Sequence, residues 1–221
     1  MRHDPATSTT TLAQSLLWTS KLLSVKPPML YVADDVDGDL SAAPVDEPSA
    51  LVSKSLASGM TLSQLAFLWG RHLSFFRPEH YLCVFFPTAE ELAMLVRASL
   101  AASGHRAVPM KSLSGEGKKL AKDLKKRLHP GSRERLKAAS QGYPVEEIDQ
   151  RVGRWLRSVE LAGGRAELVA CGDVSIAAEL VKKHPVRGTT SEEDQVSDIM
   201  CFSVSDEYAQ LRGRLGVSIA S

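Results

Sequence analysis

The chain has 221 residues, which suits one domain, or one domain with a small appendage, and is enough for a substantial core. Hydrophobic residues make up 43% and charged residues 24% of the chain, and no stretch approaches the roughly 18 consecutive apolar residues of a membrane span. The formal net charge of +1 excludes a global field that would attract nucleic acid or a membrane surface.

The N-terminal part is expected to combine one helix with short strands. Residues 1–9 are polar and threonine-rich, which indicates a disordered N-terminus without the basic and apolar regions of a signal peptide. Leucines at helical spacing predict an amphipathic helix over residues 11–25. The short apolar run 29–33 predicts a buried strand, and the acidic residues 34–39 predict a turn. Residues 49–56 are expected to supply another strand.

Two capping boxes mark the helices that follow. In residues 61–64 a threonine can accept from the backbone while a glutamine reaches back, so a helix is expected to begin at Leu62. It is expected to end before Pro78, because proline disfavours helix at the residue before it. Residues 88–91 form the second box, which predicts a helix that runs to Gly104.

The C-terminal part is expected to be helical. A basic helix with a leucine at every fourth residue is ended by Pro130-Gly131. The longest helical pattern spans residues 145–171, and Asp173 caps the next helix. Residues 185–191 predict a loop, which one or two short helices follow. Together these elements predict a helix-dominated α+β fold with a small sheet, in a single domain over residues 10–221.

The helix expected after residue 61 has the apolar pattern of a zinc peptidase helix without its metal ligands. An HExxH helix needs histidines at i and i+4, so that both imidazoles reach Zn²⁺ from one face. The glutamate after the first histidine then serves as the general base. In this chain the two ligand positions are Arg71 and Phe75, and the base position is His72. Arginine cannot be deprotonated to offer a lone pair, and phenylalanine has none.

Two segments, residues 62–75 and 159–173, resemble the ELxFxLGHELGH helix and the downstream ExxADRAGLLxxGD helix of HtpX-like gluzincin peptidases. The resemblance covers about residues 28–185 and implies a zincin-like domain in which Glu160 stands at the third zinc ligand. The residues that match the second pattern are Arg165, Ala166 and Leu168, and those that depart from it are Gly163, Gly164 and Glu167. Residues 202–212 are similar to the ends of domains that follow helical repeats in large proteins of soil deltaproteobacteria.

This resemblance implies that Arg71 and Glu160 project from two helices toward the place of the metal. A buried carboxylate without a partner costs several kcal/mol, and a guanidinium can bind a carboxylate with two parallel bonds. We therefore expect an ion pair between these two side chains. His72 is expected to be an exposed or hydrogen-bonded structural histidine. Three apolar residues of the same helix are expected in the core: Phe67, Leu68 and Phe75.

Residues 111–137 form a basic segment in a nearly neutral chain. Its candidate surface residues are Lys118, Lys119, Lys122, Lys125, Lys126 and Arg127. The segment is either the solvated face of an amphipathic helix whose leucines face the core, or a surface that binds an acidic partner or nucleic acid. No aromatic residue lies in it to stack on bases, which argues against single-stranded nucleic acid.

The sequence therefore favours a catalytically inactive zincin-like domain that acts as a protein-interaction or scaffolding module, with no catalytic residue, metal ligand or cofactor. We expect a protein partner and no membrane. Cys83, Cys171 and Cys201 share no C-x-x-C spacing, which predicts reduced thiols and suits the cytoplasm. The resemblance implies a bacterial protein. The alternative is a protein that binds nucleic acid or an acidic partner through residues 111–137. A third interpretation is an active hydrolase with relocated ligands.

Overall fold

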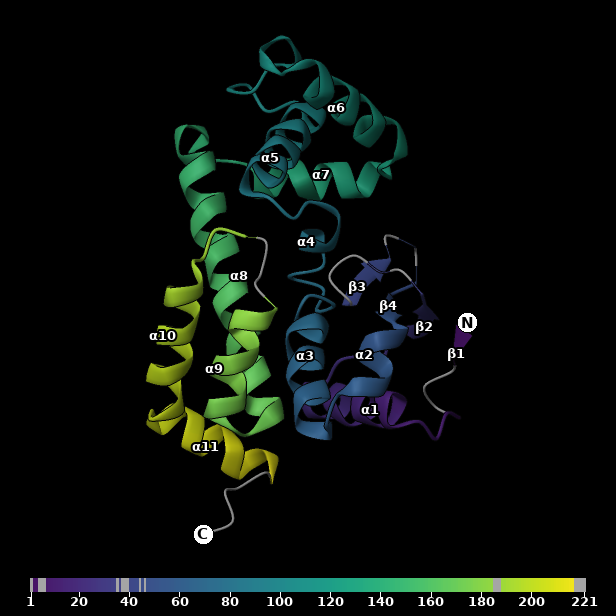
Figure 1. Ribbon diagram of the computed structural model, residues 1–221. Helices are drawn as coiled ribbons and strands as arrows, with labels where there is room; N and C mark the ends of the chain where they lie inside the picture. The colour runs from purple at the N-terminus through teal and green to yellow at the C-terminus, as the bar shows by residue number, and fades with distance from the viewer. Residues whose placement is uncertain are drawn as a thin grey trace. The chain divides into compact units, whose positions relative to one another are not determined.

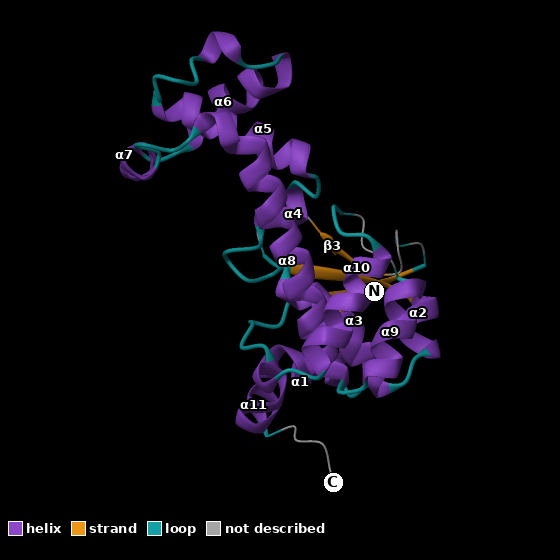
Figure 2. Ribbon diagram, turned by 90° about the vertical axis from the view of Figure 1, so that its left-hand side faces the viewer, coloured by secondary structure: helices purple, strands orange, loops and turns teal. Residues whose placement is uncertain are grey.

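The computed structural model describes residues 2–3, 7–34, 36, 40–43, 45, 47–184 and 188–216 (Figure 1). In this part of the chain, helices predominate beside one small sheet, which confirms the helix-dominated α+β class (Figure 2). The chain divides into two compact units: unit 1 comprises residues 1–85 and 157–221, and unit 2 comprises residues 86–156. The sequence predicts a single domain over residues 10–221 and does not distinguish these two units. That the domain is zincin-like stays a prediction.

The sheet of unit 1 has four short strands in the order β1-β2-β4-β3. Their bounds are Arg2–His3 for β1, Met29–Ala33 for β2, Leu40–Ala43 for β3 and Ser49–Ser53 for β4. β2 confirms the strand predicted there and pairs with β4 in parallel, while β1 and β3 are antiparallel edges. Leu30, Ala50 and Val52 are buried, so the two central strands carry the contribution of the sheet to the core.

Two expectations about this region need correction. β4 ends at Ser53 instead of residue 56, because Ser53 caps helix α2 (Lys54–Gly59) and its Oγ accepts a hydrogen bond from Leu56 N at 3.2 Å. The expected N-terminal disorder does not hold for residues 2–3, which form β1. Parts of three predicted segments lie outside the described residues: 1 and 4–6 of the N-terminus, 35 and 37–39 of the turn, and 185–187 of the loop.

The helices of unit 1 surround one apolar core. α1 (Thr11–Leu22) packs against α3 (Leu62–Ser74), and α9 (Val174–Lys183) contacts both α3 and α10 (Glu192–Ser203). The short α4 (Leu82–Phe85) follows α3, and α11 (Asp206–Leu215) packs on α10. Trp69 and Phe67 are among the largest fully buried side chains, and Trp69 Nε1 donates to Ser15 Oγ at 3.1 Å. This bond ties α3 to α1 in the interior.

Unit 2 is helical in its described residues. α5 (Ala89–Ser103) packs against α6 (Gly115–Arg127) and α7 (Pro130–Ala139). The predicted break at residues 130–131 separates α6 from α7, but it also starts a new helix, because proline suits the first helical position. α8 (Ile148–Cys171) begins in unit 2, and its residues from 157 on belong to unit 1.

Both capping boxes are present as predicted. Thr61 N donates to Gln64 Oε1 at 2.9 Å, and α3 begins at Leu62 and ends ahead of Pro78. α5 begins after Thr88 and ends at Gly104, whose φ of 83° is the left-handed conformation that glycine adopts readily at a helix end. Among the helices described, none is long and apolar enough to cross a membrane.

Candidate functional site

Helices α3 and α8 approach each other backbone to backbone at Gly70. A Cβ built on Gly70 would lie 2.7 Å from Ala166 O and 2.7 Å from the Cα of Glu167, so only glycine fits at this crossing. Gly163, one turn earlier on α8, is also close to α3, because a Cβ there would lie 3.2 Å from Ser74 Oγ. Residues three and seven apart share a helix face, so the face of α8 that meets α3 also carries Glu160.

Arg71 of α3 forms a buried ion pair with Glu167 of α8. Arg71 Nη2 donates to Glu167 Oε2 at 2.6 Å, and Arg71 Nε lies 2.5 Å from Oε1. Glu167 is 1% exposed, and burial raises the pKa of its carboxyl to about 7 although Arg71 acts in the opposite direction. Arg71 also donates to His184 O at 3.2 Å and to Gln195 Oε1 at 3.4 Å. The guanidinium thus joins α3, α8, the end of α9 and α10.

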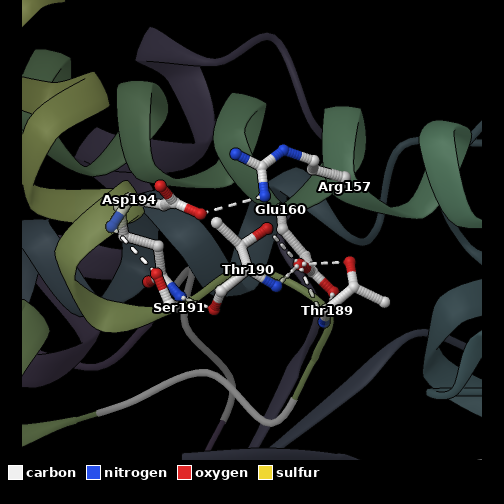
Figure 3. A network of polar contacts seen from close by, with 7 residues as sticks. Arg157, Glu160, Thr189, Thr190, Ser191 and Asp194 are labelled. Atoms are coloured by element: carbon white, nitrogen blue, oxygen red, sulfur yellow. Dashed lines mark hydrogen bonds and ion pairs between the residues drawn. The ribbon is translucent and has the colours of Figure 1, made fainter.

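Glu160 is buried on the same face of α8 and is held by a different group of donors (Figure 3). Thr189 donates from its backbone N–H at 2.9 Å and from its hydroxyl at 3.1 Å, and Thr190 does the same at 2.9 and 2.5 Å. Gly188 passes so close that a Cβ there would collide with Glu160 Oε1. The carboxylate therefore fastens the segment from Gly188 to Thr190 onto α8, where both of its oxygens accept charge-assisted hydrogen bonds.

The expected ion pair between Arg71 and Glu160 is wrong, because each of these side chains has other partners. They still belong to one network. Gln195 accepts from Arg71 through Oε1 and donates through Nε2 to Thr190 O at 3.0 Å, and Thr190 in turn donates to Glu160. The chain of contacts runs from Glu167 through Arg71, Gln195 and Thr190 to Glu160, so Arg71 and Glu160 are linked indirectly.

His72 is a buried, uncharged aromatic residue. Its ring stands edge-on to Trp69 at 5.8 Å and to Phe76 at 4.9 Å between centroids. Burial lowers the pKa of His72 to about 3, and its Nε2 has no hydrogen-bond partner among the described residues. The expectation that His72 is exposed is therefore wrong. The alternative expectation, a hydrogen-bonded histidine, is not met at Nε2. The ring contributes packing here.

The apolar residues expected in the core divide into two groups. Phe67 is 0% and Leu68 8% exposed, which confirms both as core residues. Phe75 is only partly buried and sits at the C-cap of α3, so its assignment to the core is wrong. At that position the helix ends, and the neighbouring Ser74 and Phe76 are buried in its place.

The thiols and carboxylates of the described residues do not assemble into a metal-binding group. No cluster of three or more histidine, cysteine, aspartate or glutamate side chains that could hold a metal occurs among them. Cys83 is buried, and burial together with the charge of Glu160 raises the pKa of its thiol to about 11. Burial is also the main cause that raises the pKa of the Cys171 thiol to about 11. Cys201, on α10, is exposed.

The basic candidate residues lie together on α6 of unit 2. Five of the six are exposed and Lys118 is partly exposed: Lys118, Lys119, Lys122, Lys125, Lys126 and Arg127. Ala121 and Gly117 are buried on the other side of the helix, toward α5. The sequence pattern thus located this surface, although it left open whether the surface binds anything.

Comparison with known proteins adds no relative. No family model matches the chain, and neither a curated protein nor a solved structure matches it.

Sequence reasoning missed four residues of the buried network: Glu167, Thr189, Thr190 and Gln195. One signal was present for Glu167, because it departs from the family pattern and lies two turns from Glu160 on one helix face. No local signal identified the two threonines, which meet Glu160 only through the return of the chain after α9.

Proposed function

We propose that the chain is a zincin-like pseudoenzyme that acts as a protein-interaction or scaffolding module. One observation carries the proposal. The carboxylate of Glu160, which the family resemblance places at the third ligand, accepts hydrogen bonds from two N–H groups and two hydroxyl groups. A zinc ligand must direct a lone pair at the metal, and this carboxylate directs its oxygens at threonines instead.

The other two ligand positions support the same conclusion. Arg71 has no lone pair to offer, and its guanidinium is bound by Glu167 at 2.6 Å. Phe75 has no donor atom. His72, at the position of the general base, is buried against Trp69 and Phe76, and its pKa of about 3 makes it a poor proton acceptor near neutral pH. The polar groups at this place therefore hold helices together.

A binding role is supported by the apolar side chains that unit 1 exposes. On α10 and at its C-terminal end, Met200 is 50% and Val204 86% exposed. Trp18 on α1 is 44% exposed. Exposed methionine and aromatic side chains on rigid helices are typical anchors of protein interfaces. The proposal places this module in the cytoplasm, where its three cysteines would remain reduced thiols.

The first experiment measures metal and activity in the purified full chain. We expect no stoichiometric zinc by elemental analysis, and no peptidase activity that added Zn²⁺ raises or a chelator removes. About one zinc per chain together with chelator-sensitive hydrolysis would overturn the proposal.

A second experiment tests the zincin-like geometry itself. The variant Arg71→His/Phe75→His/Thr190→Val restores two imidazoles at i and i+4 and removes the hydroxyl that is 2.5 Å from Glu160. Its matched control carries Glu160→Gln in addition. If the two helices have the zincin arrangement, Zn²⁺ should bind the first variant about tenfold or more tightly than the control. Equal Zn²⁺ affinities of the two folded variants would reject the zincin resemblance. The proposal would then rest only on the lack of metal ligands at Arg71 and Phe75.

A further inference from the structure

The charges of the chain are divided unequally between its two units. Residues 86–156 contain 14 Lys and Arg and 8 Asp and Glu, a net charge of +6. The residues of unit 1 contain 13 Lys and Arg and 18 Asp and Glu, a net charge of −5. The total of +1 therefore conceals a strongly basic unit, and unit 2 has the electrostatic character that the whole chain lacks.

Within unit 2, five of the 14 basic residues lie on one face of α6. Lys118, Lys122 and Lys125 follow one another at helical spacing, and Lys119 and Lys126 flank them on the same side. The buried residues Gly117 and Ala121 lie on the opposite side. At 1.5 Å per residue, the row from Lys118 to Lys126 is about 12 Å long. These five lysines define the lysine face.

The lysine face carries one acidic neighbour on its own helix, the exposed Asp123, which leaves the five lysines in excess. Among the described residues, no ion pair or hydrogen bond engages any of its five lysines. Half of the acidic residues of unit 2 are drawn into a separate cavity of about 730 Å³, which is lined among others by Glu90, Glu91, Glu116 and Asp149. One of them, Asp149, pairs there with Arg97 at 2.5 Å. Half of the acidic groups of the unit thus line that cavity, and of the other half only Asp123 lies on α6 itself.

The composition of the lysine face indicates what it can bind. Protein interfaces are depleted in lysine and enriched in aromatic residues and arginine, and residues 111–137 contain no aromatic residue. Single-stranded nucleic acid is bound by stacking its bases on aromatic side chains, which are missing here. A membrane-bound amphipathic helix would present apolar residues beside its lysines, but Leu120, Leu124 and Leu128 are all partly buried on the core side of α6. A row of point charges suits regularly spaced phosphates instead.

We propose that the lysine face of α6 binds double-stranded nucleic acid through its phosphate backbone, without reading its sequence. A duplex carries one negative charge per about 1.7 Å of its axis, so the row of about 12 Å lies within reach of several phosphates. This binding is independent of the pseudoenzyme site of unit 1, because the two involve different residues of different units.

The test measures binding of the full chain to a fluorescent 20-base-pair DNA duplex by anisotropy between 50 and 200 mM NaCl. Each phosphate contact lowers the slope of log K against log salt by about 0.9, so five contacts predict a slope near −4.5 and a loss of about 10²- to 10³-fold over this range. The variant Lys122→Gln/Lys125→Gln/Lys126→Gln should reduce the magnitude of the slope by about 3 and weaken binding at 50 mM NaCl by about tenfold or more.

The matched control is Lys21→Gln/Lys26→Gln/Lys182→Gln, which removes the same charge from exposed lysines of unit 1. It should bind the duplex like the wild type. An equal loss in the control would show attraction by total charge alone and overturn the proposal. So would an absence of duplex binding at 50 mM NaCl, or tighter binding of single strands than of duplex. Lysine-dependent binding of phosphatidylserine vesicles or of an oligoglutamate peptide, with no binding of duplex, would assign the face to a membrane or an acidic protein and overturn it too.

Discussion

The buried ion pair between Arg71 and Glu167 allows a quantitative test of how α3 and α8 are held together. We consider Arg71→Met and Glu167→Leu, alone and combined, at pH 8, which lies above the pKa of about 7 that the carboxyl of Glu167 has beside Arg71. Methionine and leucine keep apolar volume at both positions, so the comparison isolates charge and hydrogen bonding.

The two single substitutions should differ in cost. Arg71→Met leaves Glu167 at 1% exposure, and Arg71 is its only hydrogen-bond donor among the described residues, so a loss of about 3–5 kcal/mol is expected. Glu167→Leu leaves Arg71 with His184 O and Gln195 Oε1 as acceptors and with its side chain 13% exposed. Its loss should therefore be about 1–3 kcal/mol.

The double substitution should recover part of the loss, because it leaves no buried carboxylate without a partner. Chemical denaturation of the four proteins should give a coupling free energy of about 2–3 kcal/mol. The pair Arg165 and Asp198, which joins α8 to α10 with 42% and 16% of its side chains exposed, serves as the matched control. Its coupling should be about 1 kcal/mol or less, since solvent screens it. Additive losses at Arg71 and Glu167 would refute the argument.

Two further predictions concern the same crossing of helices. Gly70→Ala should lower the free energy of unfolding by about 1–3 kcal/mol, because its Cβ would meet α8 at 2.7 Å, whereas Gly153→Ala, with nothing within 4 Å, should raise stability by up to about 1 kcal/mol. Denaturant titration of both variants measures these changes. An unchanged free energy of unfolding in Gly70→Ala would contradict the close approach of α3 and α8. Glu167→Gln tests the raised pKa: a folded-state pKa above the ordinary 4.5 stabilises the protein below pH 4.5, and this contribution is lost as pH rises to about 7. The free energy of unfolding of the wild type minus that of this variant should fall by about 3 kcal/mol at most across that window. The lowered pKa of His72 has the opposite effect on stability, but it acts in both proteins and cancels in the difference. A flat difference between pH 4 and 8 would contradict it.

Local signals located most helices, and long-range contacts decided the site. The capping boxes at Thr61 and Thr88 act within one turn, so they could be read from four consecutive residues. The partner of Arg71 could not be read in this way, because it lies 96 residues away. Glu160 and Glu167 are two turns apart on one face of α8, so helical periodicity offers both carboxylates to α3 equally. The family resemblance favoured Glu160, whereas packing at Gly70 brings Glu167 to Arg71.

The resemblance also could not foresee which groups donate hydrogen bonds to Glu160. Its donors come from Thr189 and Thr190, after the chain has formed α9 and turned back. Two threonines in a row have no spacing that marks them as carboxylate donors, since their hydroxyls and N–H groups serve as well in turns and caps. Only the path of the backbone beside α8, where Gly188 leaves no room for a side chain, selects this role.

The unequal division of charge between the two units affects how molecules of this protein behave toward one another in solution. A protein with a net charge of +1 is usually treated as nearly neutral, with weak repulsion between copies. Here a unit with a net charge of +6 in one molecule can approach a unit with a net charge of −5 in another, so at low ionic strength this contact between unlike units is attractive. At physiological ionic strength the screening length falls to about 8 Å, and this attraction becomes short-ranged. Colloidal stability will therefore follow the salt concentration more than the net charge.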